Sequence, residues 1–138
     1  MRDEIEKYLN ECKSFEVKYD DNGNPLITDY RGISKGTIDK DKSVSKILRR
    51  RRRRRRVPKK IVEIVRLISF KLLSEKIKHR VIFGNKDVMI YLDFDHFIHI
   101  YPDKITIAGF NSLEEAPLIY LREILENYGP VKLLRPLR

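Results

Sequence analysis

Several kinds of residue and segment are scarce in this sequence, and their scarcity narrows what the protein can be. Only Cys12 among the 138 residues is a cysteine, which excludes an internal disulfide and a metal site built from several thiolates. No apolar run approaches the roughly 18 residues that cross a membrane, and the N-terminal residues are too charged for a secretory signal. We therefore expect a cytoplasmic protein, or a component of a nucleoprotein particle, without a membrane partner.

The motifs of common catalytic sites are missing as well. There is no glycine-rich phosphate loop, no G-x-S-x-G and no cysteine nucleophile with a base nearby. The segment LDFDHFIH gathers four polar side chains: Asp93, Asp95, His96 and His99. On a continuous strand Asp93 and Asp95 would share a face and could bind a divalent metal, whereas His96 and His99 would point to opposite faces. Because Asp-His is more typical of a turn, we expect no enzyme activity, no cofactor and no metal, with a metal-dependent nuclease as an alternative.

What the sequence has in excess is positive charge, and the excess lies in one place. Lys and Arg outnumber Asp and Glu by 30 to 20 in the whole chain, yet residues 46–80 alone carry 16 basic and 2 acidic residues. Their centre is a run of eight arginines. Such a block indicates a polyanionic partner, because phosphates neutralised by Arg or Lys release condensed counterions. The candidate phosphate-binding residues are Arg49, Arg50, Arg51, Arg52, Arg53, Arg54, Arg55, Arg56, Lys59, Lys60 and Arg66.

Three segments can be distinguished along the chain. The pattern within residues 1–42 predicts a short amphipathic helix, then a β-hairpin over residues 15–30 with the turn DNGNP, and then a loop. Residues 43–57 are an arginine-rich arm, which we expect to be disordered when free because adjacent like charges repel one another. Residues 58–138 predict a core domain in which a helix, three or four strands and a second helix follow in order.

The core domain is predicted from two apolar stripes and the segments between them. The stripe of residues 58–77 consists of Ile61, Ile64, Val65, Ile68 and Leu72, and that of residues 113–128 of Leu118, Leu121, Leu125 and Tyr128. Ser112 and Glu115 fit a capping box, although Pro117 allows the second helix to begin later. HRVIFG, DVMIYLDF, FIHIY and KITIAGF are typical of strands. The sequence therefore predicts an α+β fold, with an antiparallel sheet of three to five strands packed against two or three helices.

Alternation along these strands sorts their side chains onto two faces of the sheet. The face expected beneath the helices carries Val88, Ile90, Leu92, Phe94, Ile98, Ile100, Ile105 and Ile107. The opposite face carries Tyr91, Phe97 and Tyr101, which form a candidate platform for stacking unpaired bases. Alternatively, the N-terminal helix, the hairpin or a second subunit covers this face and turns it into core.

The segment FIHIYPDKITIAGFNSLEEA resembles the closing part of a TATA-binding-protein-like repeat: a strand, a short turn, a K-I-x-I-x-G strand and a helix that opens with acidic residues. The resemblance covers residues 97–128. It implies an α+β layout of sheet and helix, and we carry over no functional residue from it.

Together these observations predict a non-catalytic nucleic-acid-binding protein that contacts phosphates through its arginine-rich arm. RNA within a ribonucleoprotein particle and duplex DNA both fit this prediction. An alternative of another class is a protein-interaction adaptor whose basic arm docks on an acidic partner.

Overall fold

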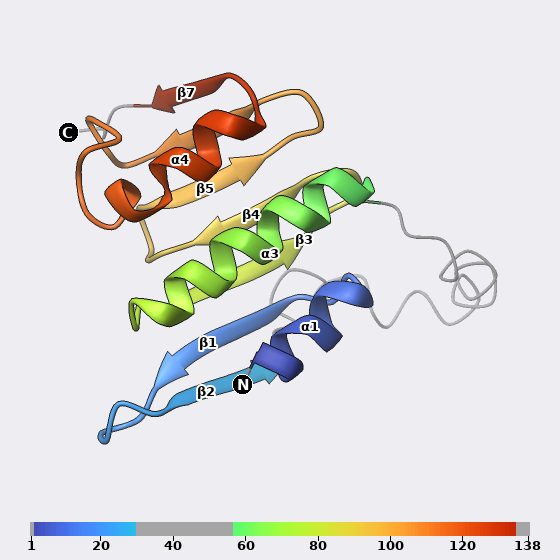
Figure 1. Cartoon of the computed structure of the whole chain (residues 1–138), viewed down its shortest axis with the longest axis vertical. Helices are drawn as coiled ribbons and strands as arrows, with labels where there is room; N and C mark the ends of the chain where they lie inside the picture. Colours follow the sequence, from blue (N-terminus) through green and yellow to red (C-terminus); the bar gives the residue numbers. More distant parts are fainter. Residues whose placement is uncertain (1, 30–56, 135–138) are drawn as a thin grey trace, which may run out of the picture.

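The computed structural model describes residues 2–29 and 57–134, which form three helices over one face of a seven-stranded sheet (Figure 1). The helices are α1 (Arg2–Asn10), α3 (Lys59–Ser74) and α4 (Leu118–Tyr128). The strands are β1 (Phe15–Tyr19), β2 (Pro25–Asp29), β3 (His79–Phe83), β4 (Val88–Tyr91), β5 (Phe97–Ile100), β6 (Ile105–Ala108) and β7 (Val131–Leu134). The predicted α+β class is confirmed. Residues 43–56 of the predicted arm lie outside the described ranges.

The strands follow the order β2-β1-β3-β4-β5-β6-β7, and all neighbours are antiparallel except β6 and β7, which are parallel. The prediction of three to five strands is wrong for two reasons. The N-terminal hairpin continues the sheet, because β1 pairs with β3 in a register that sets Phe15 opposite Val81. The C-terminal segment VKLL then adds β7 at the other edge.

The helices form where the apolar stripes predict them. The five stripe residues of α3 are at most 4% exposed, and Leu118, Leu121 and Leu125 of α4 are fully buried. Helix α4 begins directly after Pro117, at the later of the two predicted starts. Ser112 Oγ and the Glu115 carboxylate still accept backbone N–H bonds in the turn before it.

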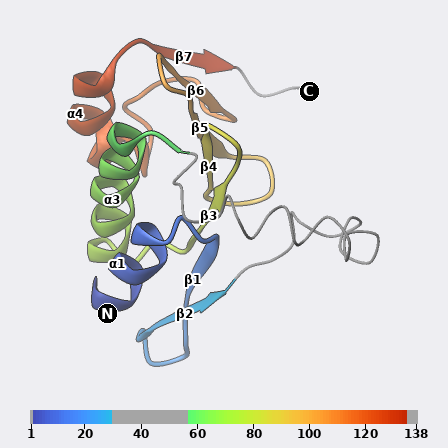
Figure 2. The ribbon, with the colours of Figure 1, turned by 90° about the vertical axis from the view of Figure 1, so that its right-hand side faces the viewer.

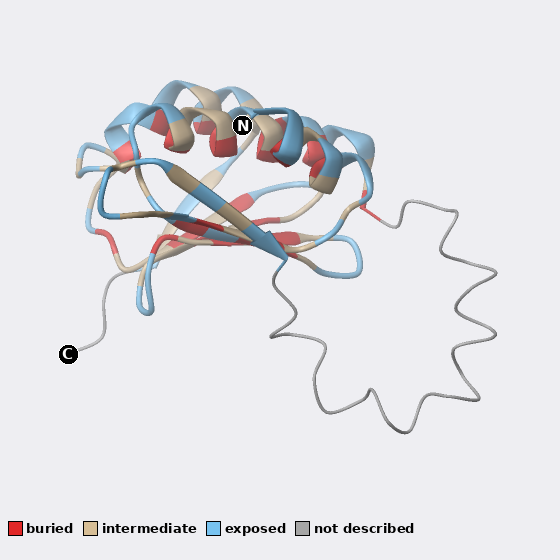
Figure 3. Cartoon of the chain, turned by 90° about the horizontal axis from the view of Figure 1, so that it is seen from below, coloured by how far each residue is buried: buried red, intermediate tan, exposed pale blue. Residues whose placement is uncertain are grey.

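The core lies between the helix layer and the sheet (Figures 2 and 3). The N-terminal segment contributes Ile5 and Leu9 from α1 and Phe15 and Val17 from β1, all four fully buried. Helix α1 packs beside α3, on the same side of the sheet. Residues 2–29 therefore share one core and one sheet with residues 57–134.

Candidate nucleic-acid interface

The sheet face opposite the helices has no described helix or strand above it (Figure 2). Two of the predicted stacking residues lie here, Tyr91 on β4 and Phe97 on β5, both half-buried and directly opposite each other across the two strands. Their ring centroids are 5.5 Å apart, with an angle of 55° between the ring planes. Because α1 packs beside α3 and the hairpin extends the sheet edge, neither N-terminal element covers these rings.

The third predicted stacking residue, Tyr101, follows β5 and already has partners for its ring. The His99 ring stacks on it with centroids 4.1 Å apart, and Lys104 Nζ lies 5.2 Å from the Tyr101 ring centroid. His99 also donates a hydrogen bond from Nε2 to the Asp87 carboxylate. Tyr101 therefore belongs to a local cluster with His99 and Lys104, whereas Tyr91 and Phe97 form a separate ring pair.

The turn between β4 and β5 places Phe94 where the sequence did not predict it. Alternation assigned Phe94 to the core, but β4 ends at Tyr91 and the following residues form a turn. Asp93 Oδ1 accepts one hydrogen bond from the Asp95 backbone N–H and one from His96 Nδ1, both at 2.8 Å. These bonds close the turn and leave Phe94 93% exposed. The core prediction for Phe94 is wrong because the strand period does not extend past the end of a strand.

The Asp93 carboxylate is engaged in the closure of this turn. The hydrogen bond from His96, with a smaller contribution from the Asp95 backbone, holds the pKa of Asp93 below its usual value. Because residues 92–96 are not a strand, Asp93 and Asp95 do not share the strand face on which the nuclease alternative depends. Within residues 2–29 and 57–134, no three or more His, Cys, Asp or Glu side chains converge on a point where a metal ion would bind.

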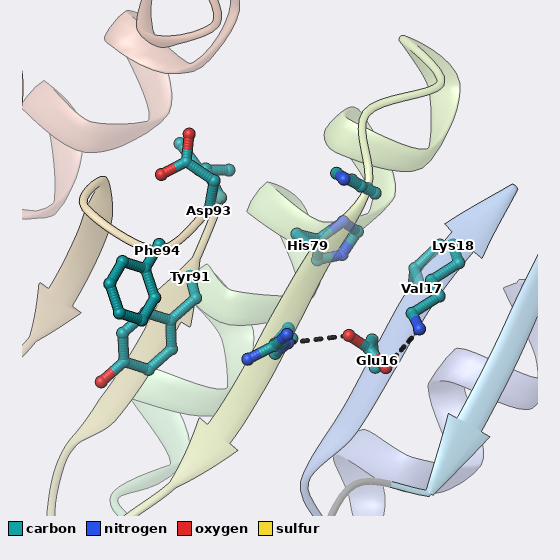
Figure 4. A pocket seen from close by; sticks show the side chains of 10 residues that line it. Glu16, Val17, Lys18, His79, Tyr91, Asp93 and Phe94 are labelled. Carbon is teal, nitrogen blue, oxygen red and sulfur yellow. Dashed lines mark hydrogen bonds and ion pairs between the residues drawn. The ribbon is translucent and has the colours of Figure 1, made fainter.

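A shallow hollow of about 270 Å³ opens beside the Tyr91 ring (Figure 4). Tyr91 and Phe94 both line one flank, and Glu16 and Lys18 of β1 line the other. Arg80 of β3 lines the hollow between them and donates from Nε to Glu16 Oε2 at 2.7 Å. The hollow thus brings aromatic rings, cations and a carboxylate within reach of one small ligand.

None of the predicted phosphate-binding residues that the structure describes lines this hollow. Arg49–Arg56 are outside the described ranges. Lys59 and Lys60 are exposed in the first turn of α3, and Lys60 Nζ lies 5.6 Å from the Tyr128 ring centroid. Both lysines belong to the helix layer, on the side of the molecule away from the open sheet face (Figure 2).

Arg66, also predicted to bind phosphate, connects α3 to α1. Its Nε donates to Glu6 Oε1 at 2.8 Å and its Nη2 to Asn10 Oδ1 at 3.2 Å, and it also contacts Glu63 on its own helix. The hydrogen bond to Glu6 raises the pKa of Arg66. This contact is a structural one, and the sequence could not reveal it because the two partners are 60 positions apart.

The described residues do not carry the net positive charge of the chain. They contain 15 Lys and Arg and 18 Asp and Glu, a net charge of −3, whereas the whole chain has a net charge of +10. The excess therefore belongs to the residues outside the described ranges, chiefly the eight arginines.

Comparison of the chain with protein-family models, with curated proteins and with solved structures gave no match. The resemblance of residues 97–128 to a TATA-binding-protein-like repeat thus stays a prediction. None of the described helices combines the length and the apolar character that crossing a membrane requires.

Proposed function

We propose that this protein is a non-catalytic nucleic-acid-binding protein that holds phosphates through Arg49–Arg56. The observation that carries the proposal is the separation of charge, with eight consecutive arginines joined to a folded body of net charge −3. Guanidinium groups bind phosphates bidentately and stack on bases. Counterion release then supplies affinity for any sequence, so RNA in a ribonucleoprotein particle and duplex DNA both remain candidate ligands.

The folded body supports this proposal through its open sheet face. Exposed sheet faces that carry aromatic rings bind single strands in several nucleic-acid-binding folds, because every base has a π-face that can stack. Tyr91 and Phe97 provide such rings, half-buried in the structure and with no described element above them.

We predict that replacing Arg49–Arg56 by alternating Ser and Gly abolishes most of the affinity for nucleic acid and leaves thermal stability nearly unchanged. The replaced block holds no apolar residue, so it contributes nothing to a core. Binding titrations at several salt concentrations check the mechanism, because log K should fall by about 0.9 per neutralised phosphate on duplex DNA for each unit of log salt, and by about 0.7 on single strands. A variant with eight lysines is the matched control, and it should keep most of the non-specific affinity.

Two results would contradict the proposal. One is a wild-type protein that binds neither RNA nor DNA at low salt. The other is binding that does not depend on the eight arginines. Retention of an acidic protein by the arginine run, without any nucleic acid, would favour the adaptor alternative.

A further inference from the structure

The exposed ring of Phe94 lines the same hollow as the Tyr91 ring. A single exposed apolar side chain needs no explanation, since scattered ones are normal on protein surfaces. Phe94, however, lines the same hollow as Tyr91 (Figure 4), and Tyr91 contacts Phe97 with ring centroids 5.5 Å apart. The lining of the hollow therefore contains two aromatic rings, and one of them contacts a third.

The turn that carries Phe94 is held by two independent features. The Asp93 carboxylate accepts both turn-closing hydrogen bonds described above. The end of β6 also packs against this turn at Gly109, whose φ is +92°, and a Cβ there would lie 2.5 Å from the Asp95 carbonyl oxygen. A side chain at position 109 would thus displace the turn. Phe94 is presented on a backbone that is fixed before any ligand arrives, which reduces the ordering cost of binding.

The rest of the hollow supplies charged groups of both signs. Its basic lining residues are Lys18, Lys78 and Arg80, and its acidic ones are Glu16 and Asp93. Lys18 and Arg80 both pair with Glu16, at 3.6 Å and 2.7 Å, so a phosphate would compete with this carboxylate for Lys18. Cations of this kind neutralise a phosphate, and carboxylates accept hydrogen bonds from the exocyclic amino groups of bases. At about 270 Å³ the hollow is below the roughly 300 Å³ at which pockets for drug-sized ligands begin, so it has room for one ring system.

We propose that this hollow binds one unpaired nucleotide, with its base stacked on Phe94 and Tyr91 and its phosphate facing Lys18 and Lys78. The proposal rests on the proposed function and makes it more specific, since the ligand class becomes single-stranded nucleic acid. Bases inside a duplex are already stacked and paired, and their faces cannot reach a ring on the protein surface. The arginine run then gives affinity for any nucleic acid, and the hollow gives a preference for single strands.

The test uses the full chain and three alanine variants, Phe94→Ala, Tyr91→Ala and the control Tyr120→Ala. Tyr120 is a 45% exposed ring on α4, in the helix layer away from the hollow. The probes are a fluorescently labelled single-stranded oligonucleotide of mixed sequence and a duplex of the same sequence, each as RNA and as DNA. Phe94→Ala should weaken single-strand binding roughly 5- to 150-fold, the effect of losing one stacked base, and should leave duplex binding unchanged. Tyr91→Ala should act in the same direction, and Tyr120→Ala should have no effect.

A second measurement reports stacking itself. A fluorescent adenine analogue that is quenched when it stacks should lose emission on binding to the wild-type protein and to Tyr120→Ala, and should lose less on binding to Phe94→Ala. Because Phe94 is 93% exposed, its removal cannot act through unfolding. This variant keeps the test decisive even where Tyr91→Ala destabilises the protein.

The possible results separate this inference from the proposed function. If the wild-type protein binds nucleic acid and Phe94→Ala binds single strands equally well, the hollow is not a nucleotide site, while the proposed function stands. If the wild-type protein binds no nucleic acid, both fall. If Phe94→Ala instead abolishes self-association or binding of an acidic peptide, the face serves a protein partner and the inference is overturned.

Discussion

At the scale of single residues, His79 is the titratable group whose surroundings differ most from water. It is 2% exposed, its Nε2 lies 2.8 Å from Ser69 Oγ, and its Nδ1 lies 3.0 Å from the Ile77 carbonyl oxygen. A carbonyl oxygen only accepts, so Nδ1 carries the proton and Nε2 accepts from the Ser69 hydroxyl. Burial lowers the pKa of His79 to about 4, against a smaller opposing effect of the bond to Ile77.

We predict that the protein loses stability as the pH falls below about 6.5, because of His79. In the unfolded chain His79 binds a proton near its ordinary pKa of about 6.5, whereas in the folded protein it stays neutral down to about pH 4. As the pH falls, the unfolded state takes up the proton first. The stability that neutral His79 contributes is therefore complete above pH 6.5 and is lost as the pH falls toward 4. By pH 5 the free energy of unfolding should decrease by about 2 kcal/mol through this one residue.

Urea unfolding of the wild-type protein at pH 7 and pH 5 measures this loss. The control is His79→Gln, whose amide can serve both hydrogen-bond partners but does not titrate. If the wild-type protein and His79→Gln lose the same free energy between the two pH values, the loss comes from other groups and the assignment to His79 is wrong.

At the scale of elements, α1 is held on α3 by buried apolar contacts and by the guanidinium of Arg66. The Arg66 side chain is 21% exposed and lies between the Glu6 carboxylate of α1 and the Glu63 carboxylate of α3. Contacts of this kind are stronger than fully exposed ion pairs, because part of the guanidinium is removed from water and it donates to two helices at once.

We predict that Arg66→Met lowers the free energy of unfolding by about 1 to 2 kcal/mol, between the values typical of exposed ion pairs and of hydrogen bonds to charged groups. The methionine keeps the aliphatic part of the side chain, so the loss reports the polar contacts. Arg122→Met is the matched control, since Arg122 of α4 makes exposed contacts with Glu114 and Glu126, and it should have a clearly smaller effect.

Chemical denaturation of both variants measures the difference. Nucleic-acid affinity of Arg66→Met should equal that of the wild-type protein, because the guanidinium is occupied by carboxylates. A selective loss of affinity without a loss of stability would instead support the phosphate contact that the sequence predicted for Arg66.

At the scale of the whole molecule, local patterns predicted the elements and long-range pairing decided their arrangement. Alternation correctly set Ile90 and Ile98 toward the helices and Tyr91 and Phe97 on the opposite face, because period-2 geometry is a property of each strand alone. The pairing of β1 with β3 joins segments some sixty positions apart, and the parallel pairing of β7 follows a helix. No local pattern encodes either.

The candidate site was predictable to a similar extent. The positions of Tyr91 and Phe97 followed from alternation, but that of Phe94 did not. The strand pattern ends at Asp93, whose carboxylate accepts two hydrogen bonds within the turn. An Asp side chain that accepts a hydrogen bond from the backbone N–H two residues later is a recognisable turn signal. Applied to Asp93, this signal would have placed Phe94 in a turn and outside the core.

Two phenylalanines test whether the N-terminal segment is part of the folded unit. Phe15 on β1 is fully buried and Phe94 is 93% exposed. The Phe15 ring stacks on Tyr8 of α1, with centroids 5.5 Å apart, and meets the edge of the His79 ring of β3 at 6.5 Å. Phe15 therefore joins the N-terminal helix and hairpin to the central strands.

We predict that Phe15→Ala lowers the free energy of unfolding by about 3 to 5 kcal/mol, as truncation of a buried phenylalanine does, and that Phe94→Ala leaves it nearly unchanged. Against a total of about 5 to 15 kcal/mol for a protein domain, the first loss is large. Guanidinium unfolding of the two variants and the wild-type protein measures both values. If residues 58–138 folded as a domain of their own, with the N-terminal segment only attached, Phe15→Ala would leave the main unfolding transition where it is. A single transition shifted to lower denaturant would show that α1, β1 and β2 unfold together with the rest of the sheet.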